Sequence, residues 1–297
     1  DGSSCTGCFW PNVLFRCHRV TEASLARKPF RVWQYKGNLG FRVRSFRAIP
    51  TLVYTSQVLK NRVEGRLRPP SGERSRGAAG ARRSVVIPNA VDPFWLAKNP
   101  TPPPQKLTLC AVGRLETTKG TDILLAAFAA VRKEIPGATL HLVGGGEIPR
   151  YVSRARELGI AHAVTFHGPI APLTVQSIVS GSTAVVSSHL WEEPFGRSAL
   201  EAGACGRPLV ASDLGGVRET TTKDTALLVP SGNVEALAST LVTLAREPER
   251  ARRIGAAARQ HVEERFHPGT IARRHQELYR ASVSGFSPTH GEKIPTE

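Results

Sequence analysis

Short apolar segments recur at intervals from residue 106 onward, and this recurrence constrains the fold more than any other feature of the chain. Amphipathic stretches, such as residues 122–135 and 149–158, separate most of these segments. Buried strands that alternate with helices are typical of a parallel sheet covered on both faces. We therefore expect an α/β domain with a doubly wound sheet, in which ligands bind at the carboxyl ends of the strands. The expected strands are residues 107–112, 139–143, 164–167, 183–187, 208–212 and 226–229.

The rest of the chain is less regular. Apolar runs at 48–56 and 84–87 predict two further strands, and residues 69–83, rich in Pro, Gly, Ser and Arg, predict a loop. Consecutive prolines make residues 99–105 the expected linker between domains. The expected parts are an N-terminal domain at 1–98, a ligand-binding domain at 106–268, and a C-terminal helix and tail at 269–297. Helices are also expected at 234–246, 249–266 and 269–282.

Charge is concentrated in the first third of the chain. The formal net charge is +16, and residues 1–105 hold 18 Lys and Arg against 5 Asp and Glu. Such a basic region suggests an anionic membrane surface, a lipid-phosphate acceptor or nucleic acid, although a solvated basic face is an equal alternative. Zinc-finger spacing and an RNA-recognition signature are absent from the sequence, which counts against nucleic acid. With no apolar run long enough to span a bilayer, we expect a cytoplasmic protein that can associate with the inner face of a membrane.

Two further features concern cysteine and methionine. Cys5, Cys8 and Cys17 have a spacing that suits metal ligands, but a second C-x2-C pair is missing, so a zinc site stays an open alternative. Cys110 and Cys205 lie in apolar segments and are expected in the core. The chain contains no Met, so we expect that Asp1 is not the native start and that the chain begins inside a domain.

The loop after the first regular strand carries two cations. Arg114 and Lys119 stand five residues apart, at the carboxyl end of the strand and before a helix, an arrangement that suits a diphosphate. An exposed charged turn is the alternative. The next strand ends in Gly144-Gly145-Gly146, which allows either a tight turn or a close backbone approach to a ligand.

The segment 187–202, SSHLWEEPFGRSALEA, is the most specific in the chain. We expect a helix to begin near Phe195, with the amides from Gly196 to Ser198 directed at an anion. Glu193 and Glu201 lie eight residues apart, so we expect Glu201 two turns into the helix and both carboxylates facing one cleft. Solvated surface acids are the alternative for either one alone. A further glycine turn follows the next strand, at residues 213–219.

These motifs together resemble those of a known family. The order G-R-L-x3-K-G, E-P-F-G-x4-E-A and G-G-x2-E, over about 106–268, resembles the donor domain of family 4 retaining glycosyltransferases with the GT-B fold. The segment 87–92 looks like the crossing strand between the two domains of that fold, and residues 1–60 look like part of the acceptor-side, Rossmann-like domain. The resemblance implies an N-terminal domain without its opening strands. Gly203, where the family usually has Met, departs from the pattern.

The resemblance also implies roles for individual residues. Arg114 and Lys119, after Gly113, would neutralise the diphosphate of a nucleotide-sugar donor, and Glu193 would contact the donor sugar. The other expected donor-binding residues are Ile170 on the nucleobase, Phe195, Gly196, Arg197 and Ser198 around the diphosphate, and Glu201 on the ribose. No metal or other cofactor is expected, because the cations replace it.

The resulting hypothesis is a retaining glycosyltransferase of glycan biosynthesis that acts on a lipid-linked or saccharide acceptor. Two alternatives stay open: a non-catalytic nucleotide-sugar-binding module and a sugar-nucleotide epimerase of the same fold. The sequence does not distinguish the donor base, the sugar or the oligomeric state.

Overall fold

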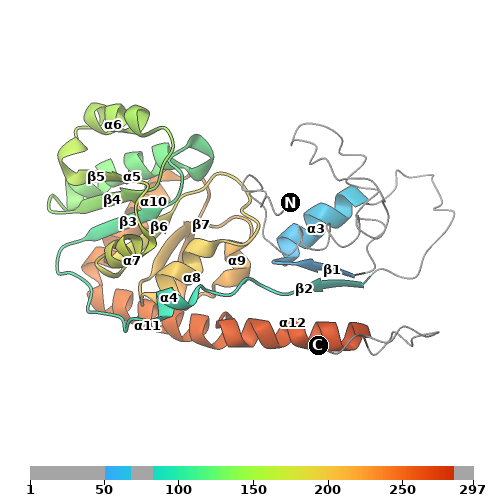
Figure 1. Ribbon diagram of the computed structural model, residues 1–297. Helices are drawn as coiled ribbons and strands as arrows, with labels where there is room; N and C mark the ends of the chain where they lie inside the picture. The colour runs from blue at the N-terminus through green and yellow to red at the C-terminus, as the bar shows by residue number, and fades with distance from the viewer. Residues whose placement is uncertain (1–50, 68–82, 284–297) are drawn as a thin grey trace, which may run out of the picture. The chain divides into compact units, whose positions relative to one another are not determined.

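The computed structural model describes residues 51–67 and 83–283, and the chain divides into two compact units, Asp1–Ile87 and Pro88–Glu297 (Figure 1). Several expectations lie outside the described residues. They are the possible metal site at Cys5, Cys8 and Cys17, nearly all of the loop at 69–83, the end of the tail, and much of the basic first third.

The first unit contains a parallel pair of strands joined through a helix. Thr51 pairs with Arg83 and Tyr54 with Val86. The side chains of Leu52, Tyr54 and Leu59 are almost fully buried against one another. The two strands predicted in this region are therefore confirmed. The elements are β1 (Thr51–Tyr54), α3 (Gln57–Leu67) and β2 (Arg83–Val86).

The second unit is built on a six-stranded sheet in the order β5-β4-β3-β6-β7-β8, and each neighbouring pair is parallel. All six strands coincide with the predicted apolar segments to within one residue, so the doubly wound parallel sheet is confirmed. The strands are β3 (Thr108–Val112), β4 (Thr139–Val143), β5 (Val164–Gly168), β6 (Ala184–Ser187), β7 (Leu209–Ser212) and β8 (Ala226–Val229).

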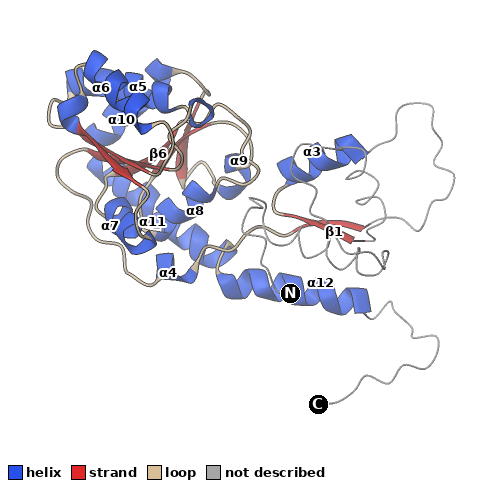
Figure 2. Ribbon diagram, turned by 45° about the horizontal axis from the view of Figure 1, so that its top comes forward, coloured by secondary structure: helices blue, strands red, loops and turns tan. Residues whose placement is uncertain are grey.

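Helices cover both faces of this sheet, with α5, α6 and α10 on one side and α4, α7 and α8 on the other (Figure 2). Each strand contributes apolar side chains to both faces; in β4, Leu142 belongs to the core beneath α5 and Val143 to the core beneath α8. The helices of this unit are α4 (Pro93–Leu96), α5 (Thr121–Glu134), α6 (Ile148–Glu157), α7 (Pro172–Ser180), α8 (Arg197–Ala204), α9 (Val217–Thr220), α10 (Val234–Arg246), α11 (Pro248–Arg265) and α12 (Pro268–Val283), with short 3-10 turns η1 (Thr117–Lys119) and η2 (Ala161–Ala163).

The two cysteines of the second unit lie in the core, as predicted. Cys110 is fully buried and Cys205 is 3% exposed, and both thiols are free. Burial raises the pKa of Cys110 to about 12, so this thiol stays protonated and inert at neutral pH.

The boundary between the units lies earlier than the proline-rich segment suggested. The second unit begins at Pro88 rather than after a linker at 99–105, because the residues between are anchored within it. The amide of Val91 donates to the Phe266 carbonyl at 2.9 Å, and Trp95 is 4% exposed in the core. The buried Arg207 guanidinium donates to the Thr101 carbonyl at 2.6 Å, so the proline-rich segment packs against this unit.

Gly203 explains one departure from the family pattern. A Cβ at this position on α8 would lie 2.8 Å from a methyl of Val262 and 2.9 Å from the carbonyl oxygen of Ala258, both on α11. Side chains in close-packed cores do not tolerate such contacts without displacement. The close approach of α8 to α11 therefore requires glycine at residue 203. A larger residue would displace α8, which carries Glu201, away from α11.

This packing predicts that Gly203→Met lowers the free energy of unfolding by roughly 1–3 kcal/mol, the usual range for overpacking. Urea denaturation followed by tryptophan fluorescence measures the change. Gly137→Ala is the matched control, because a Cβ there meets nothing within 4 Å. Equal stability of Gly203→Met and the wild type would contradict the packing argument.

Candidate functional site

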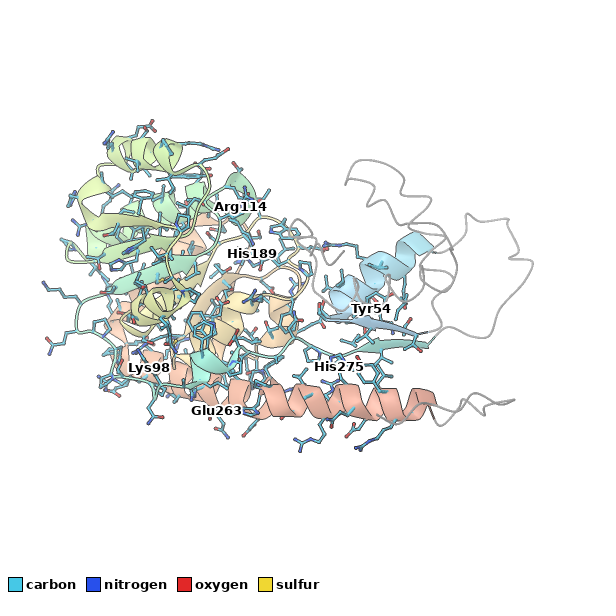
Figure 3. The ribbon with its side chains drawn as sticks, in the orientation of Figure 1. Tyr54, Lys98, Arg114, His189, Glu263 and His275 are labelled. Atoms are coloured by element: carbon cyan, nitrogen blue, oxygen red, sulfur yellow. The ribbon has the colours of Figure 1, made fainter. Side chains whose placement is uncertain are left out.

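The strand order changes direction between β3 and β6. From β3 the chain proceeds outward to β4 and β5, and from β6 it proceeds outward on the other side to β7 and β8. Doubly wound folds bind ligands at such a switch point, in the crevice outside the carboxyl ends of the strands. Here that place, called the crevice below, is bounded by the loops that follow β3 and β6. Figure 3 labels Arg114 from the first loop and His189 from the second, at this end of the sheet.

The loop after β3 presents both predicted cations. The Arg114 side chain is 69% exposed, and its Nε lies 3.5 Å from Oε2 of Glu116. Lys119 is the last residue of the 3-10 turn η1 and is only 31% exposed. The two cations thus differ in setting: one is extended into solvent, and the other is held against the protein.

The structure brings Lys119 together with Glu193, although 74 residues separate them. Lys119 Nζ donates to Glu193 Oε1, and the same ammonium lies 5.4 Å from the centre of the Trp191 ring. The Glu193 side chain is 14% exposed. A partly buried pair of this kind interacts more strongly than a fully exposed ion pair, because less water screens it.

Helix α8 begins two residues later than predicted. Phe195 packs in the core, with its ring 6.1 Å from that of Phe266, and Gly196 forms the N-cap with φ of 79°. The helix starts at Arg197 and has no side-chain cap. The first amides of a helix have no intrahelical acceptor, so those of Arg197 and Ser198 can bind an anion with the help of the helix dipole.

Glu201 lies one turn into α8, not two as expected from a start near Phe195. Its Oε1 is 3.4 Å from a guanidinium nitrogen of Arg197, and its side chain is 16% exposed. Burial, opposed by Arg197 and reinforced by the negative charge of Glu193, raises the pKa of Glu201 to about 7. The Glu201 carboxyl is therefore partly protonated near neutral pH. It can accept hydrogen bonds when ionised and donate one when protonated.

The glycines after β4 hold another loop. A Cβ at Gly144 would strike the Gly113 carbonyl, and one at Gly146 would strike the backbone of Leu115. The amide of Leu115 donates to the Gly145 carbonyl at 2.7 Å. These glycines therefore allow close approach to the loop that carries Arg114, a contact that the sequence did not indicate. Close approach of the same backbone to a ligand stays a prediction.

The loop after β6 is held from both sides in the same way. Gly120 lies against the carbonyl of Ser188, and Gly216 lies where a Cβ would be 2.6 Å from the Phe195 Cα. The Gly216 amide donates to the Glu193 carbonyl at 2.7 Å. The backbone that carries Glu193 is therefore fixed by its neighbours on either side.

His189 is a site residue that the sequence analysis missed. Its side chain is 1% exposed. Nδ1 lies 3.2 Å from the Ser187 hydroxyl, and Nε2 lies 3.1 Å from the Leu214 carbonyl after β7. The ring thus bridges two loops of the crevice. The signal in the sequence that marks it is its position two residues after a buried strand.

Two other predicted residues lie at the edge of this arrangement. Gly113 follows β3 and its amide donates to the Val143 carbonyl at 2.8 Å. Ile170 follows β5, the outermost strand on that side, and is partly buried against the core that contains Val143.

Among the described residues, the structure holds no group of three or more His, Cys, Asp or Glu placed to bind a metal. Within residues 51–67 and 83–283, no helix has the length and hydropathy of a membrane span.

Known proteins share sequence similarity with this chain. The family described as glycosyl transferases group 1 matches residues 94–261. The chain is 33% identical over 213 residues to a glycogen synthase of Mycobacterium tuberculosis, covering 69% of the chain and 50% of that protein. It is 32% identical over 244 residues to a D-inositol 3-phosphate glycosyltransferase of Thermomonospora curvata, covering 77% and 52%. The chain thus spans about half the length of the curated relatives it matches.

Solved structures show the same fold. Sucrose-phosphate synthase from Thermosynechococcus elongatus superposes with a TM-score of 0.67 and 26% identity, over 86% of this chain and 65% of that one. Anabaena Alr3699/HepE in complex with UDP gives a TM-score of 0.72 at 21% identity, over 91% and 77%. The predicted fold class, α/β of the GT-B type, is confirmed.

The raised pKa of Glu201 predicts a pH-dependent stability. Unfolding returns this acid from about 7 to its ordinary value of 4.5, so the unfolded state loses the proton first. The Glu201 contribution therefore lowers stability progressively as pH rises from about 4.5 to 7, by on the order of 3 kcal/mol in total. Denaturation of wild type and Glu201→Gln at pH 5 and pH 8 measures it: the variant gains relative stability at pH 8. Identical pH dependence in the two proteins would rule out a raised pKa.

Proposed function

Because the chain belongs to the glycosyl transferases group 1 family, we propose that it transfers a hexosyl group from a nucleoside-diphosphate-sugar to an acceptor hydroxyl. One observation carries the proposal: the cation Lys119, the carboxylate Glu193 and the uncapped start of α8 converge at the switch point of the sheet. A diphosphate at this place would receive both an ammonium and helix amides.

The proposed chemistry depends on stabilising the leaving group. As the bond between the sugar and the diphosphate breaks, negative charge develops on the diphosphate oxygen. Arg114 and Lys119 supply positive charge from the β3 loop, and the amides of Arg197 and Ser198 supply fixed dipoles from α8. Donors held in place before the reaction contribute most, because they need no reorganisation during it. We propose that these groups act in place of a divalent cation.

The ion pair between Lys119 and Glu193 suggests how the site responds to the donor. A bound diphosphate gives Lys119 a second anionic partner, which leaves Glu193 able to accept hydrogen bonds from hydroxyls of the donor sugar. Glu201, deeper along α8, is proposed to accept hydrogen bonds from the ribose diol, and Ile170 to pack against the base. The protonation equilibrium of Glu201 near pH 7 then links ribose binding to proton release.

We further propose that the anomeric configuration is retained. In such a step the departing diphosphate oxygen takes the proton of the acceptor hydroxyl on the face from which it leaves, while the new bond forms on that same face. The support is family membership together with the spacing of Glu193 and Glu201 in the sequence.

The acceptor is proposed from the names of the relatives. One is named for glycogen and others for inositol 3-phosphate, so a saccharide or another polyhydroxylated acceptor is favoured over a lipid-linked one. The lipid-linked alternative, and with it the inner face of a membrane, depends on the basic first third, much of which lies outside the described residues.

We expect one of UDP, GDP and ADP to bind in isothermal titration calorimetry. Arg114→Ala and Lys119→Ala should each weaken that binding at least about tenfold, because each removes a charge-assisted contact. The control Arg154→Ala removes an exposed arginine of α6 that pairs with Glu157 at 2.8 Å, and it should bind like wild type. Equal affinity in all four proteins would place the nucleotide elsewhere.

Turnover separates an enzyme from a binding module. With UDP-glucose and a maltooligosaccharide, we expect a product whose new linkage is α, read from the anomeric coupling constant in the proton NMR spectrum. A β linkage would contradict retention. UDP binding without transfer or donor hydrolysis would instead favour the non-catalytic module.

A further inference from the structure

A cavity lies along the opposite margin of the sheet from Ile170. It has a volume of about 570 Å³ and is bounded by the edge strand β8, helix α10 and the turn that follows α9. This volume is within the range of small-molecule sites. The loops after β3 and β6 contribute none of its lining residues, so it is separate from the donor crevice.

Positive charge surrounds this cavity. Arg218 of α9, Lys223 of the following turn and Arg250 of α11 line it, and none of the described residues that line it is acidic. Two of the cations have partners outside the lining: Arg218 Nε lies 2.5 Å from Asp213, and Arg250 lies 2.9 Å from Glu247. Lys223 is exposed and forms no ion pair within the described part of the chain. An anion placed here would meet cations from three different elements.

Helix α10 adds a row of hydroxyls. Ser239, Thr240 and Thr243 line the cavity, and residues three and four apart on a helix share one face. Serine and threonine within helices commonly donate to a carbonyl of the preceding turn, as Ser177 of α7 does to Leu173 at 3.0 Å. The three hydroxyls of α10 make no such bond with any described residue. They are available to a ligand.

Apart from Thr221 and Thr222 of the turn after α9, the remaining lining is apolar. Leu244 is 1% exposed and Leu227 is half-buried beside it. A ligand that matches the whole cavity therefore has an anionic group for the rim, hydroxyls for the α10 row, and a carbon skeleton for the leucines. We propose that this cavity is a second ligand site of the chain, which binds a small phosphorylated polyol with its phosphate toward Lys223 and Arg250.

Calorimetry with ribose 5-phosphate, ribose and inorganic phosphate, at constant ionic strength, tests the proposal. Ribose 5-phosphate should bind more tightly than ribose or inorganic phosphate, because only it meets both the cations and the hydroxyls. Lys223→Ala should weaken its binding about tenfold through the lost charged contact, and Thr240→Val severalfold through the lost hydroxyl. Lys133→Ala, which removes an exposed lysine from α5, is the matched control and should have no effect.

Two further measurements distinguish loss of binding from loss of folding, and the cavity from the donor crevice. Thermal unfolding of the Lys223 and Thr240 variants checks that they fold. Arg114→Ala should bind ribose 5-phosphate like wild type while its nucleotide binding is weakened. The proposal is overturned by the absence of binding, by equal weakening in Lys133→Ala, or by displacement of ribose 5-phosphate by the nucleotide that occupies the donor crevice.

Discussion

The candidate site depends on direct backbone contact between loops at the carboxyl edge of the sheet. The Leu190 amide donates to the Thr118 carbonyl at 2.8 Å, and the Gly216 amide donates to the Glu193 carbonyl at 2.7 Å. Gly120 and Gly216 allow these loops of the chain to approach one another this closely. As a result, the segments that carry Lys119 and Glu193 are held by rigid neighbours before any ligand arrives. Such preorganisation is what electrostatic stabilisation of a leaving group requires.

Much of the fold was predictable from the sequence, because strands buried on both faces are continuously apolar. The strands 139–143 and 226–229 and the helix 234–246 have the predicted bounds. The unit boundary was not predictable in the same way, because consecutive prolines indicate a stiff segment and not what it packs against. Whether residues 99–105 join two units or lie on one depends on Trp95 and Arg207, whose partners are distant in the sequence.

The sequence predicted which loops carry the site residues, but not which of those residues contact one another. Arg114, Lys119, Glu193 and Glu201 all lie at the carboxyl edge of the sheet, as their places after strands indicated, and their roles stay predictions. The contact of Lys119 with Glu193 depends on the order β3-β6, which no local pattern encodes. The same holds for the bridging ring of His189. The family pattern, in turn, does not explain Gly203, which only the contact between α8 and α11 accounts for.

The most direct test of the central claim is a crystal structure of the chain with the nucleoside diphosphate that binds it. We predict that the diphosphate lies at the start of α8, within hydrogen-bond distance of the amides of Arg197 and Ser198, and that Lys119 contacts it. A diphosphate bound elsewhere, with Lys119 still paired only with Glu193, would contradict the account.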